Sequence, residues 1–389
     1  MASSAPPSTS PATARTGRRP ADGQVRYAVV GLGHIAQSAV LPGIAQATRN
    51  SRIAALVSSD PTKLEELGRL YNVPHVCGYG DYQALLSSGD IDAVYLALPN
   101  DQHATYAILA AEAGVHVLCE KPMAVTSADC LAMIAAATKH GVRLMVAYRL
   151  HFERGNLAAL TAATLGKLGE LRYFTSTLSM QLSPDDIRSR PLVLGGGTLY
   201  DLGIYCINAA RYLFKAEPIE VSAMSARRAD DPRFRQIDEM TSATLRFPGD
   251  RLATFTCSFG SAATSAYELV GTTASLRVEQ AYEHEEVMTQ TVTAEGTMTS
   301  WKIAKRDQFA AEVDYFSQCV LTGSDPEPSG MEGLADVRII EALGEAIRRN
   351  RSVPLAEFIK LERPAPSQEV MYPPAEKPQL VHARSPSAG

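Results

Sequence analysis

The sequence has 389 residues, 46% of them hydrophobic and 20% charged, so it is long enough for two globular domains with buried cores. Its 37 basic and 42 acidic residues give a net charge of −5, which argues against nucleic acid or an anionic membrane as a partner. No stretch approaches the ~18 consecutive apolar residues that a membrane-spanning helix needs. We therefore expect a globular protein without a membrane span.

The six cysteines are spread along the chain without C-x-x-C or zinc-ligand spacing. An even number permits disulfides, but in a chain of this length we favour buried reduced thiols. Residues 1–24 are rich in Ala, Ser, Pro and Thr, and Arg18-Arg19 is followed by Pro20 instead of the apolar stretch of an export signal. We predict a flexible arm over residues 1–24 and a cytoplasmic location.

Short apolar runs alternate with helical patterns over residues 25–147. Strands are predicted at residues 25–30, 52–58, 75–77, 93–98, 116–119 and 143–147. Helices are predicted at residues 35–48, 61–71, 101–113 and 127–140, with Asp101 and Ser127 as N-caps and Gly114 and Gly141 as stops. This alternation predicts an α/β domain of the Rossmann type, with a doubly wound parallel sheet covered on both faces.

The pattern changes near residue 148, and residues 148–360 are predicted to form an α+β domain with a large, mainly antiparallel sheet. Its strands are predicted at residues 170–181, 219–226, 241–247, 252–259, 267–270 and 274–279, with a turn at Pro248-Gly249-Asp250. Helices are predicted at residues 152–165, 197–214, 307–321 and 331–349, the last two closing the core of this domain. Residues 361–389 are Pro-rich and polar, which predicts a surface-draped or disordered tail.

A glycine motif connects the first predicted strand to the first predicted helix. The sequence Gly31-Leu32-Gly33-His34-Ile35-Ala36 fits G-x-G-x-x-G/A, in which the first glycine allows a tight turn and the second lets the backbone approach a pyrophosphate. The position between strand and helix favours a dinucleotide site. A glycine turn without a ligand is the alternative.

The end of the second strand indicates which dinucleotide is bound. A carboxylate there binds the ribose hydroxyls of NAD, whereas Ser58 and Ser59, with Lys63 in reach, suit the 2′-phosphate of NADP. Asp60 would favour NAD if it turned inward, but before Pro61 it is better interpreted as a helix N-cap. We therefore predict NADP.

Three further motifs follow in order: Leu98-Pro99-Asn100-x-x-His103, Cys119-Glu120-Lys121-Pro122, and GGGTLYDLGIY from Gly195 to Tyr205. Together with the glycine motif they resemble the Gfo/Idh/MocA oxidoreductases, and within them the glucose–fructose and aldose–aldose oxidoreductase branch. Much of that family has His at the last position of the third motif, where this chain has Tyr205. The resemblance covers residues 25–350.

Asp201 and Tyr205 are separated by four residues, so they share one face of a helix. Oxidation of a hydroxyl carbon needs an acceptor for the hydride and a base for the proton. A neighbouring ammonium group would stabilise the tyrosinate. We interpret Tyr205 as the general acid/base, Lys121 as its electrostatic partner and a substrate binder, and Asp201 as the orienting carboxylate that also contacts substrate. The alternative is that none of them is catalytic, with Tyr205 in the core and with Lys121 and Asp201 on the surface.

The resemblance extends to other candidates. It implies that Arg149 lies near cofactor and substrate, while His151 either binds sugar hydroxyls or lies at the domain interface. Asn100 and His103 are expected to face the cofactor, with helix capping as the alternative for Asn100. Tyr79 is a candidate for stacking on adenine and Arg188 for binding the pyrophosphate, unless Arg188 is a solvated loop residue. The remaining cofactor-binding candidates are Leu98, Pro99, Glu120 and Lys121. No metal is predicted.

These residues predict an NADP(H)-dependent oxidoreductase that oxidises an aldose at C1 to the aldonolactone. The resemblance implies a tightly bound cofactor that a second sugar reoxidises, an N-terminal arm lying over the adenine, and dimers or tetramers formed through the free face of the second sheet. A conventional NADP-dependent aldose 1-dehydrogenase and a non-catalytic dinucleotide-sensing regulator are the alternatives.

Overall fold

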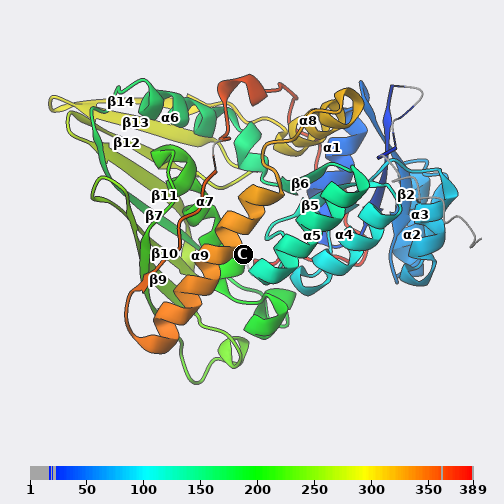
Figure 1. Cartoon of the computed structure of the whole chain (residues 1–389), viewed down its shortest axis with the longest axis horizontal. Helices are drawn as coiled ribbons and strands as arrows, with labels where there is room; N and C mark the ends of the chain where they lie inside the picture. Colours follow the sequence, from blue (N-terminus) through cyan, green and yellow to red (C-terminus); the bar gives the residue numbers. More distant parts are fainter. Residues whose placement is uncertain (1–16, 19, 21–22, 361, 388–389) are drawn as a thin grey trace, which may run out of the picture.

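The computed structural model describes residues 17, 18, 20, 23–360 and 362–387, and most of the predicted arm lies outside these residues. Figure 1 shows two sheets side by side, a smaller one with helices on both faces and a larger one with helices on one face. No helix among the described residues is long and apolar enough to cross a membrane. All six cysteines lie in the described part and are free thiols, as expected.

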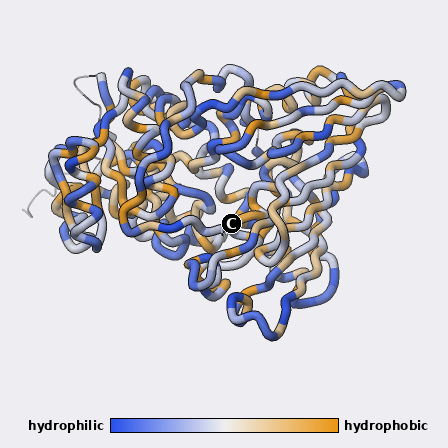
Figure 2. Tube along the Cα trace, turned by 180° about the vertical axis from the view of Figure 1, so that it is seen from behind, coloured by the Kyte–Doolittle hydropathy of each residue, from blue (hydrophilic) through white to orange (hydrophobic). Residues whose placement is uncertain are grey.

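The first domain is built on a parallel sheet with strand order β3-β2-β1-β4-β5-β6. Its strands are β1 (Val25–Val30), β2 (Ser51–Val57), β3 (His75–Cys77), β4 (Ala93–Leu96), β5 (His116–Glu120) and β6 (Leu144–Ala147). Most of these strands are buried on both faces, which explains their continuous apolar runs, and Figure 2 shows hydrophobic stretches inside this domain. This order confirms the predicted Rossmann topology.

The helices of the first domain are α1 (Leu41–Gln46), α2 (Pro61–Leu70), α3 (Tyr82–Ser88), α4 (His103–Glu112) and α5 (Ser127–His140). A π-helical turn, η1 (Ala36–Val40), precedes α1. Two predicted caps are wrong. Thr126, one residue before Ser127, caps α5, and Asp101 pairs with Arg190 of the second domain instead of capping α4. Sequence analysis also missed α3.

The second domain contains a nine-stranded sheet with order β14-β13-β12-β11-β7-β10-β9-β8-β15, antiparallel except for the parallel β7–β10 pair. Its strands are β7 (Leu171–Gln181), β8 (Glu220–Ala226), β9 (Met240–Phe247), β10 (Arg251–Ser258), β11 (Gly260–Gly271), β12 (Ala274–Glu279), β13 (Met288–Ala294), β14 (Thr297–Ile303) and β15 (Val353–Pro354). Burial alternates along β9 and β10, because one face packs on helices and the other does not. The predicted hairpin between these two strands is confirmed.

The helices that follow β6 are α6 (Arg154–Thr164), α7 (Ile204–Phe214), α8 (Gln308–Thr322) and α9 (Gly330–Arg349). A π-helical turn, η7 (Leu199–Gly203), leads into α7. The prediction that α8 closes the second core is wrong. Phe309 and Phe316 of α8 join the core of the first domain, and the backbone of α8 at Phe309 packs closely on Gly43 of α1. The second half of the chain therefore completes the first domain.

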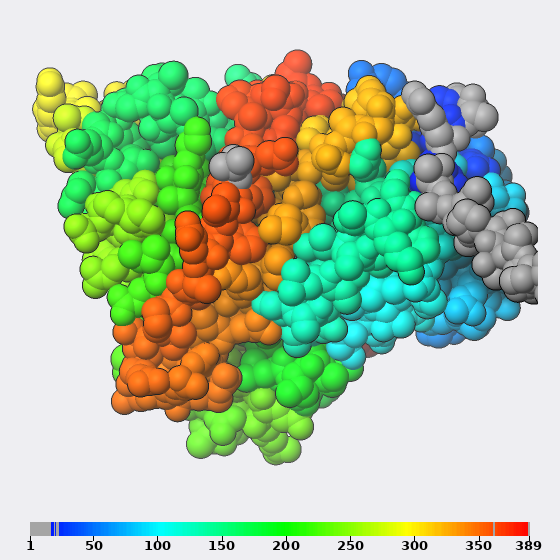
Figure 3. Space-filling view, viewed as in Figure 1, coloured from blue at the N-terminus to red at the C-terminus, as the bar shows by residue number. Residues whose placement is uncertain are grey.

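The chain after α9 crosses the surface and ties several elements together. Figure 3 shows this orange-to-red segment lying along α9 and reaching the junction with α8. Lys360 forms ion pairs with Glu327 and Glu332, and the side chain of Gln368 donates to the Glu327 carbonyl at 2.5 Å. Residues 362–387 are thus draped over the surface.

Candidate active site

The glycine turn has the geometry that a dinucleotide site needs. Gly31 adopts a left-handed conformation (φ 93°), and a Cβ there would lie 2.4 Å from the Ala97 carbonyl oxygen. Gly33 is exposed, and a Cβ there would meet no atom within 4 Å. The helix formed by η1 and α1 starts directly after the turn, so its first N–H groups face the same open space as Gly33. The residues present therefore fit a bound pyrophosphate.

Asp60, which follows β2, is engaged by other residues of the protein. Oδ1 of Asp60 accepts hydrogen bonds from the backbone N–H groups of Thr62 and Lys63, at 3.0 and 3.2 Å, so Asp60 is the N-cap of α2 as expected. Its Oδ2 accepts from Nδ1 of His382 at 2.9 Å. Both carboxylate oxygens are engaged within the protein, which leaves Asp60 poorly placed to bind a ribose diol.

Lys121, Asp201 and Tyr205 come together at the junction of the two domains. Lys121 lies just after β5, whereas Asp201 lies in η7 and Tyr205 in the first turn of α7. Nζ of Lys121 donates to both the backbone carbonyl and Oδ1 of Asp201, at 2.9 Å each, and lies 4.7 Å from the centre of the Tyr205 ring. The three residues therefore form one contiguous cluster.

A second cation holds the other oxygen of Asp201. Nε of Arg188 donates to Oδ2 of Asp201 at 2.7 Å, and its Nη1 donates to Asp186 at 3.2 Å. Arg188 is thus neither a solvated loop residue nor free to turn fully toward a pyrophosphate. Its positive charge also helps to lower the pKa of His34 in the glycine turn, where burial is the larger cause. Arg188 therefore holds the Asp201 carboxylate, and its charge also acts on His34 in the glycine turn.

The charges of this cluster stabilise one another. Burial alone would raise the pKa of Asp201, but Arg188 and Lys121 outweigh it and lower that pKa to about 2. Burial would likewise lower the pKa of Lys121, and the attraction of Asp201 and Tyr205 outweighs it, so this pKa is raised. Asp201 is a carboxylate and Lys121 an ammonium group throughout the neutral range.

Arg149 is the second cation, after Lys121, that lies beside the Tyr205 ring. Its guanidinium carbon lies 5.4 Å from the centre of the Tyr205 ring. Its two terminal nitrogens donate to Oε1 of Gln308 and to the carbonyl of Tyr282, at 2.5 Å each. The Tyr205 hydroxyl itself has no hydrogen-bond partner among the described residues, and the side chain is half-buried. The phenol is therefore held by its ring, and its hydroxyl is free to react.

The triple glycine allows this loop to pass between the domains. Gly195 and Gly197 have positive φ angles of 77° and 98°, and a Cβ on Gly196 would lie 1.8 Å from the Arg190 carbonyl oxygen. Nδ2 of Asn100 donates to the Gly195 carbonyl at 2.7 Å. Asn100 therefore does not cap α4, and its amide links the first domain to this loop.

Two predicted site histidines are buried and bonded to other residues of the protein. His103 is fully buried, and its ring nitrogens are both engaged by backbone carbonyls, those of Pro122 and Leu98, at 2.8 and 2.9 Å. The His151 side chain has no exposed surface, and its Nε2 is bonded to Asn208 at 2.8 Å. Burial lowers the pKa of His151 to about 4. His103 thus joins two loops, and the burial of His151 favours the interface position over the sugar ligand.

Other predicted cofactor residues lie near the motif loops. The Glu120 carboxylate accepts hydrogen bonds from the Tyr95 hydroxyl at 2.8 Å and from the Lys121 backbone at 3.2 Å. The Tyr79 ring packs edge-on against Tyr106, with the ring centres 5.9 Å apart. Leu98 is buried, while Pro99 and Ile35 are half-buried and Ser59 is exposed. Their contacts with a cofactor stay predictions, as does the absence of a metal.

Family profiles match both domains of this chain. The profile described as an oxidoreductase family with an NAD-binding Rossmann fold matches residues 25–148, and that of the GFO/IDH/MocA C-terminal domain matches residues 157–277. The two ranges cover more than half of the sequence. The chain belongs to the Gfo/Idh/MocA oxidoreductase family. The family resemblance that the motifs predicted is thereby confirmed.

Relatives within the Gfo/Idh/MocA family span nearly the whole chain. The D-xylose 1-dehydrogenase [NADP(+)] of Haloarcula marismortui is 30% identical over 344 residues, which are 86% of this chain and 94% of that protein. The aldose–aldose oxidoreductase of Caulobacter crescentus, solved in complex with glycerol, is 35% identical, with a TM-score of 0.81 over 85% of this chain and 100% of that one. KijD10, a 3-ketoreductase of Actinomadura kijaniata solved with NADP and TDP-benzene, is 26% identical, with a TM-score of 0.75 over 83% and 98% of the two chains.

In this Gfo/Idh/MocA chain, the supporting residues of the site were missed by sequence analysis. Gln308 and Tyr282 hold Arg149, and Asp186 holds Arg188. Gln308 lies in α8 and Tyr282 in the loop after β12, far from any motif. No local pattern marks them, because their role depends on the packing of α8 against the first domain. Only the pair Asp186 and Arg188, two residues apart with opposite charges, offered a usable signal.

Proposed function

We propose that this protein is an NADP(H)-dependent sugar oxidoreductase that oxidises an aldose at C1 to the aldonolactone. The unpartnered hydroxyl of Tyr205, on a ring flanked by Lys121 and Arg149, is the observation that carries the proposal. This arrangement suits removal of a proton from a substrate oxygen. The names of two relatives, a D-xylose 1-dehydrogenase and an aldose–aldose oxidoreductase, support an aldose as substrate.

In the proposed reaction, the cofactor accepts the hydride and the side chains of the site handle the proton and the charge. When bound, NADP supplies the nicotinamide that accepts a hydride, with two electrons, from C1 of the sugar. Tyr205, as the phenolate, accepts the proton of the O1 hydroxyl, so a C=O bond replaces the C–H and O–H bonds that break. The cations Lys121 and Arg149 stabilise the negative charge on the phenolate.

Lys121 also has a free donor for the sugar. Its ammonium group has three N–H bonds, two of which point to the oxygens of Asp201. The third is available to a substrate oxygen or to the Tyr205 oxygen. Both carboxylate oxygens of Asp201 are already engaged, by Lys121 and Arg188, so the role of Asp201 is to hold these cations in place.

NADP is favoured over NAD by the end of β2. Asp60 is engaged by the α2 backbone and by His382, which leaves Ser58, Ser59 and Lys63 as the residues predicted to bind a 2′-phosphate. The relative from Haloarcula marismortui is named as NADP(+)-dependent, and KijD10 was solved with NADP. The cytoplasmic location predicted from the sequence is consistent with the free thiols.

Native mass spectrometry and product analysis of the purified protein test this proposal. We expect a mass corresponding to bound NADP, and formation of an aldonolactone when an aldose such as xylose or glucose is added. Turnover without added nucleotide, with a second aldose converted to an alditol, supports a retained and recycled cofactor. Turnover only with added NADP supports the conventional dehydrogenase. A protein that binds nucleotide but changes no aldose contradicts the proposal and supports the regulator.

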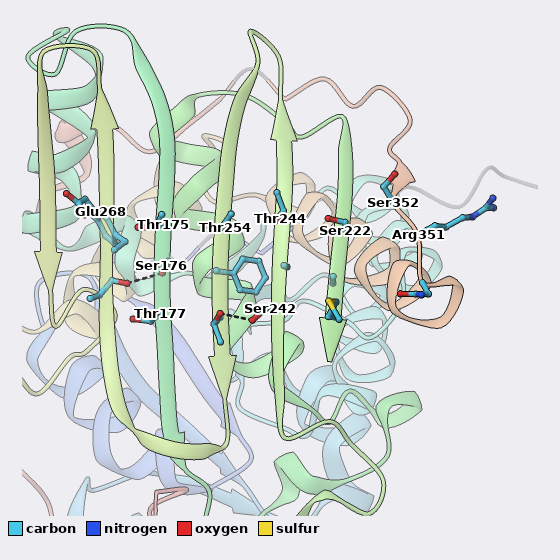
Figure 4. Close-up of a pocket in the computed structure, with 18 of the residues that line it drawn as sticks. Thr175, Ser176, Thr177, Ser222, Ser242, Thr244, Thr254, Glu268, Arg351 and Ser352 are labelled. Atoms are coloured by element: carbon cyan, nitrogen blue, oxygen red, sulfur yellow. Dashed lines mark hydrogen bonds between the residues drawn. The ribbon is translucent and has the colours of Figure 1, made fainter. Parts of the chain in front are cut away.

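The exposed face of the large sheet supports a homo-oligomer. Helices cover one face of this sheet in Figure 1. The other face holds a shallow pocket with a volume of about 630 Å³, lined by many Ser and Thr residues and shown in Figure 4. Tyr173, Met224 and Leu252 are exposed in its strands β7, β8 and β10. We propose that a second copy of the chain packs on this face. Sedimentation analysis of the wild type and of Thr254→Glu tests it, because a buried carboxylate at the interface would favour the monomer.

A further inference from the structure

The last described residues of the chain lie beside the dinucleotide turn. We name residues 371–387 the C-terminal strap. The side chain of Gln37, in η1, is buried, and its Nε2 donates to the Leu32 carbonyl of the glycine turn at 2.9 Å. The same amide forms two hydrogen bonds with the strap, from Nε2 to the Val381 carbonyl at 2.9 Å and from Val381 N–H to Oε1 at 2.7 Å. One side chain thus joins the glycine turn to the strap.

The next residue of the strap reaches the end of β2. His382 has a left-handed backbone conformation (φ 45°), which is uncommon for a residue other than glycine, and its Nδ1 contacts Oδ2 of Asp60 at 2.9 Å. Asp60 follows Ser58 and Ser59, the residues assigned to the phosphorylated ribose. Val381 and His382 therefore flank the adenosine side of the proposed cofactor site, between the end of β1 and the end of β2.

The end of the strap is bonded to the other domain. The backbone N–H of Ser183 donates to the Pro386 carbonyl at 2.8 Å, and Leu182 and Ser387 form an isolated β-bridge. These residues follow β7 and precede the loop that carries Arg188. In Figures 1 and 2 the C-terminus lies between the two domains from either side. The strap therefore connects the two domains across the side of the cofactor turn.

The start of the strap is fixed as well, so its course is defined along its length. The Tyr372 hydroxyl donates to Oδ2 of Asp314 in α8 at 3.0 Å, and its carbonyl accepts from the Asp307 N–H at 3.2 Å. Lys377 pairs with Glu285 at 2.6 Å. Tyr372 and Val381 also pack on the core of the first domain.

We propose that the C-terminal strap is part of the dinucleotide site and retains the bound nucleotide. The space in front of Gly33 is open, so the strap borders the site without filling it. Because the strap is bonded on both sides of the junction, one of its ends must detach before a nucleotide held behind it can leave. The inference rests on the proposed function, since it assumes a dinucleotide at the glycine turn. The strap lies outside residues 25–148 and 157–277, which match the family.

The N-terminal arm does not occupy this position in the described residues. The backbone N–H of Arg18 donates to the Gly114 carbonyl, and the Arg18 guanidinium donates to the carbonyls of Leu86 and Ile91. These residues precede β4 and β5, so they lie at the amino ends of the parallel strands, whereas the glycine turn lies at the carboxyl end of β1. The expectation that the arm covers the adenine is therefore wrong for Arg18, and its remainder lies mostly outside the described residues.

The rate of nucleotide release tests the strap. NADPH is bound to the full-length protein and chased with excess NADP⁺, and the loss of bound-nucleotide fluorescence is followed in a stopped-flow instrument. We expect removal of residues 379–389 to accelerate release by about tenfold or more, because it removes the hydrogen bonds to Gln37, Asp60 and Ser183. His382→Ala removes one contact and should give a smaller acceleration in the same direction.

A matched control separates this effect from a general loss of stability. His75 contacts Asp90 on the surface of the same domain, away from the strap, so His75→Ala should leave the release rate unchanged. Unchanged release in both the truncated and the His382→Ala proteins, with wild-type melting temperatures, would overturn the proposal. If the truncated protein does not fold, His382→Ala decides alone. Slow, strap-dependent release without any aldose turnover would uphold the strap and reject the proposed function instead.

Discussion

Nζ of Lys121 lies 2.9 Å from both the backbone carbonyl and Oδ1 of Asp201, so an amine of the first domain is fixed by a helix of the second. This contact joins the motif after β5 to the motif before α7, which are 80 residues apart in the chain. Because Arg188 engages the other carboxylate oxygen, Asp201 holds two cations at once. The site therefore exists only when the domains are packed together.

Replacement of the phenol tests the proton transfer. We expect Tyr205→Phe to lower kcat by about 10²- to 10⁴-fold, because it removes the general acid/base and keeps the ring between Lys121 and Arg149. Nucleotide affinity, measured by calorimetric titration with NADP⁺, should stay within about twofold of the wild type. Tyr282→Phe, on the neighbouring ring, is the control. A Tyr205→Phe enzyme with wild-type kcat would exclude Tyr205 as the base.

The Asp201 carboxylate should make the protein less stable in acid. Its pKa of about 2 lies below the ordinary value of 3.8, so its contribution to folding is complete above pH ~4 and is lost as the pH falls toward 2. The contribution is about 2 kcal/mol. Asp201→Asn should remove it, which is measured as a smaller difference between the unfolding free energies at about pH 6 and pH 3. An unchanged difference would show that the ion pairs do not stabilise the fold.

The same substitution should also alter catalysis. Asn at position 201 cannot neutralise Lys121 and Arg188, so we expect kcat to fall by about tenfold or more while the KM for nucleotide changes little. Steady-state kinetics with varied NADP⁺ distinguish the two parameters. If KM rises and kcat is constant, Asp201 contributes to cofactor binding rather than to positioning Lys121.

The two glycines of the turn should respond differently to alanine. A Cβ at Gly31 would lie 2.4 Å from the Ala97 oxygen, on a backbone with φ 93°, so Gly31→Ala should lower the melting temperature by several degrees. A Cβ at Gly33 meets no protein atom, so Gly33→Ala should fold normally yet bind NADP⁺ at least tenfold more weakly. Thermal melts and binding titrations of both variants check this. Normal binding by Gly33→Ala would place the pyrophosphate elsewhere.

The preference for NADP should depend on Lys63. We expect Lys63→Glu to weaken NADP⁺ binding by about tenfold or more and to leave NAD⁺ binding nearly unchanged, since only the former carries the 2′-phosphate. Lys167→Glu, an exposed lysine of the second domain, makes the same charge change away from the site. Equal loss of both affinities would indicate that Lys63 contacts a part shared by the two nucleotides.

The sequence by itself determined the Rossmann sheet, the glycine turn and the three motifs of the site. These features are local: buried parallel strands require continuous apolar runs, and a left-handed turn such as that at Gly31 requires glycine. The sequence did not predict β13 and β14. Their Thr, Gln and Ser residues fit a sheet with one open face, but the two segments have no strong apolar pattern.

Only the tertiary structure decided which polar side chains are free to bind ligands. His103 and His151 are candidate ligands in the sequence, yet packing buries them, and both ring nitrogens of His103 and Nε2 of His151 bond within the protein. Gln308 carries no sequence signal, yet a contact over 159 residues of sequence places it beside Arg149. The strap shows the same principle, because Gln37 and Val381 are 344 residues apart. Hydrogen-bond partners at such separations are set by how the domains pack, which local sequence patterns do not encode.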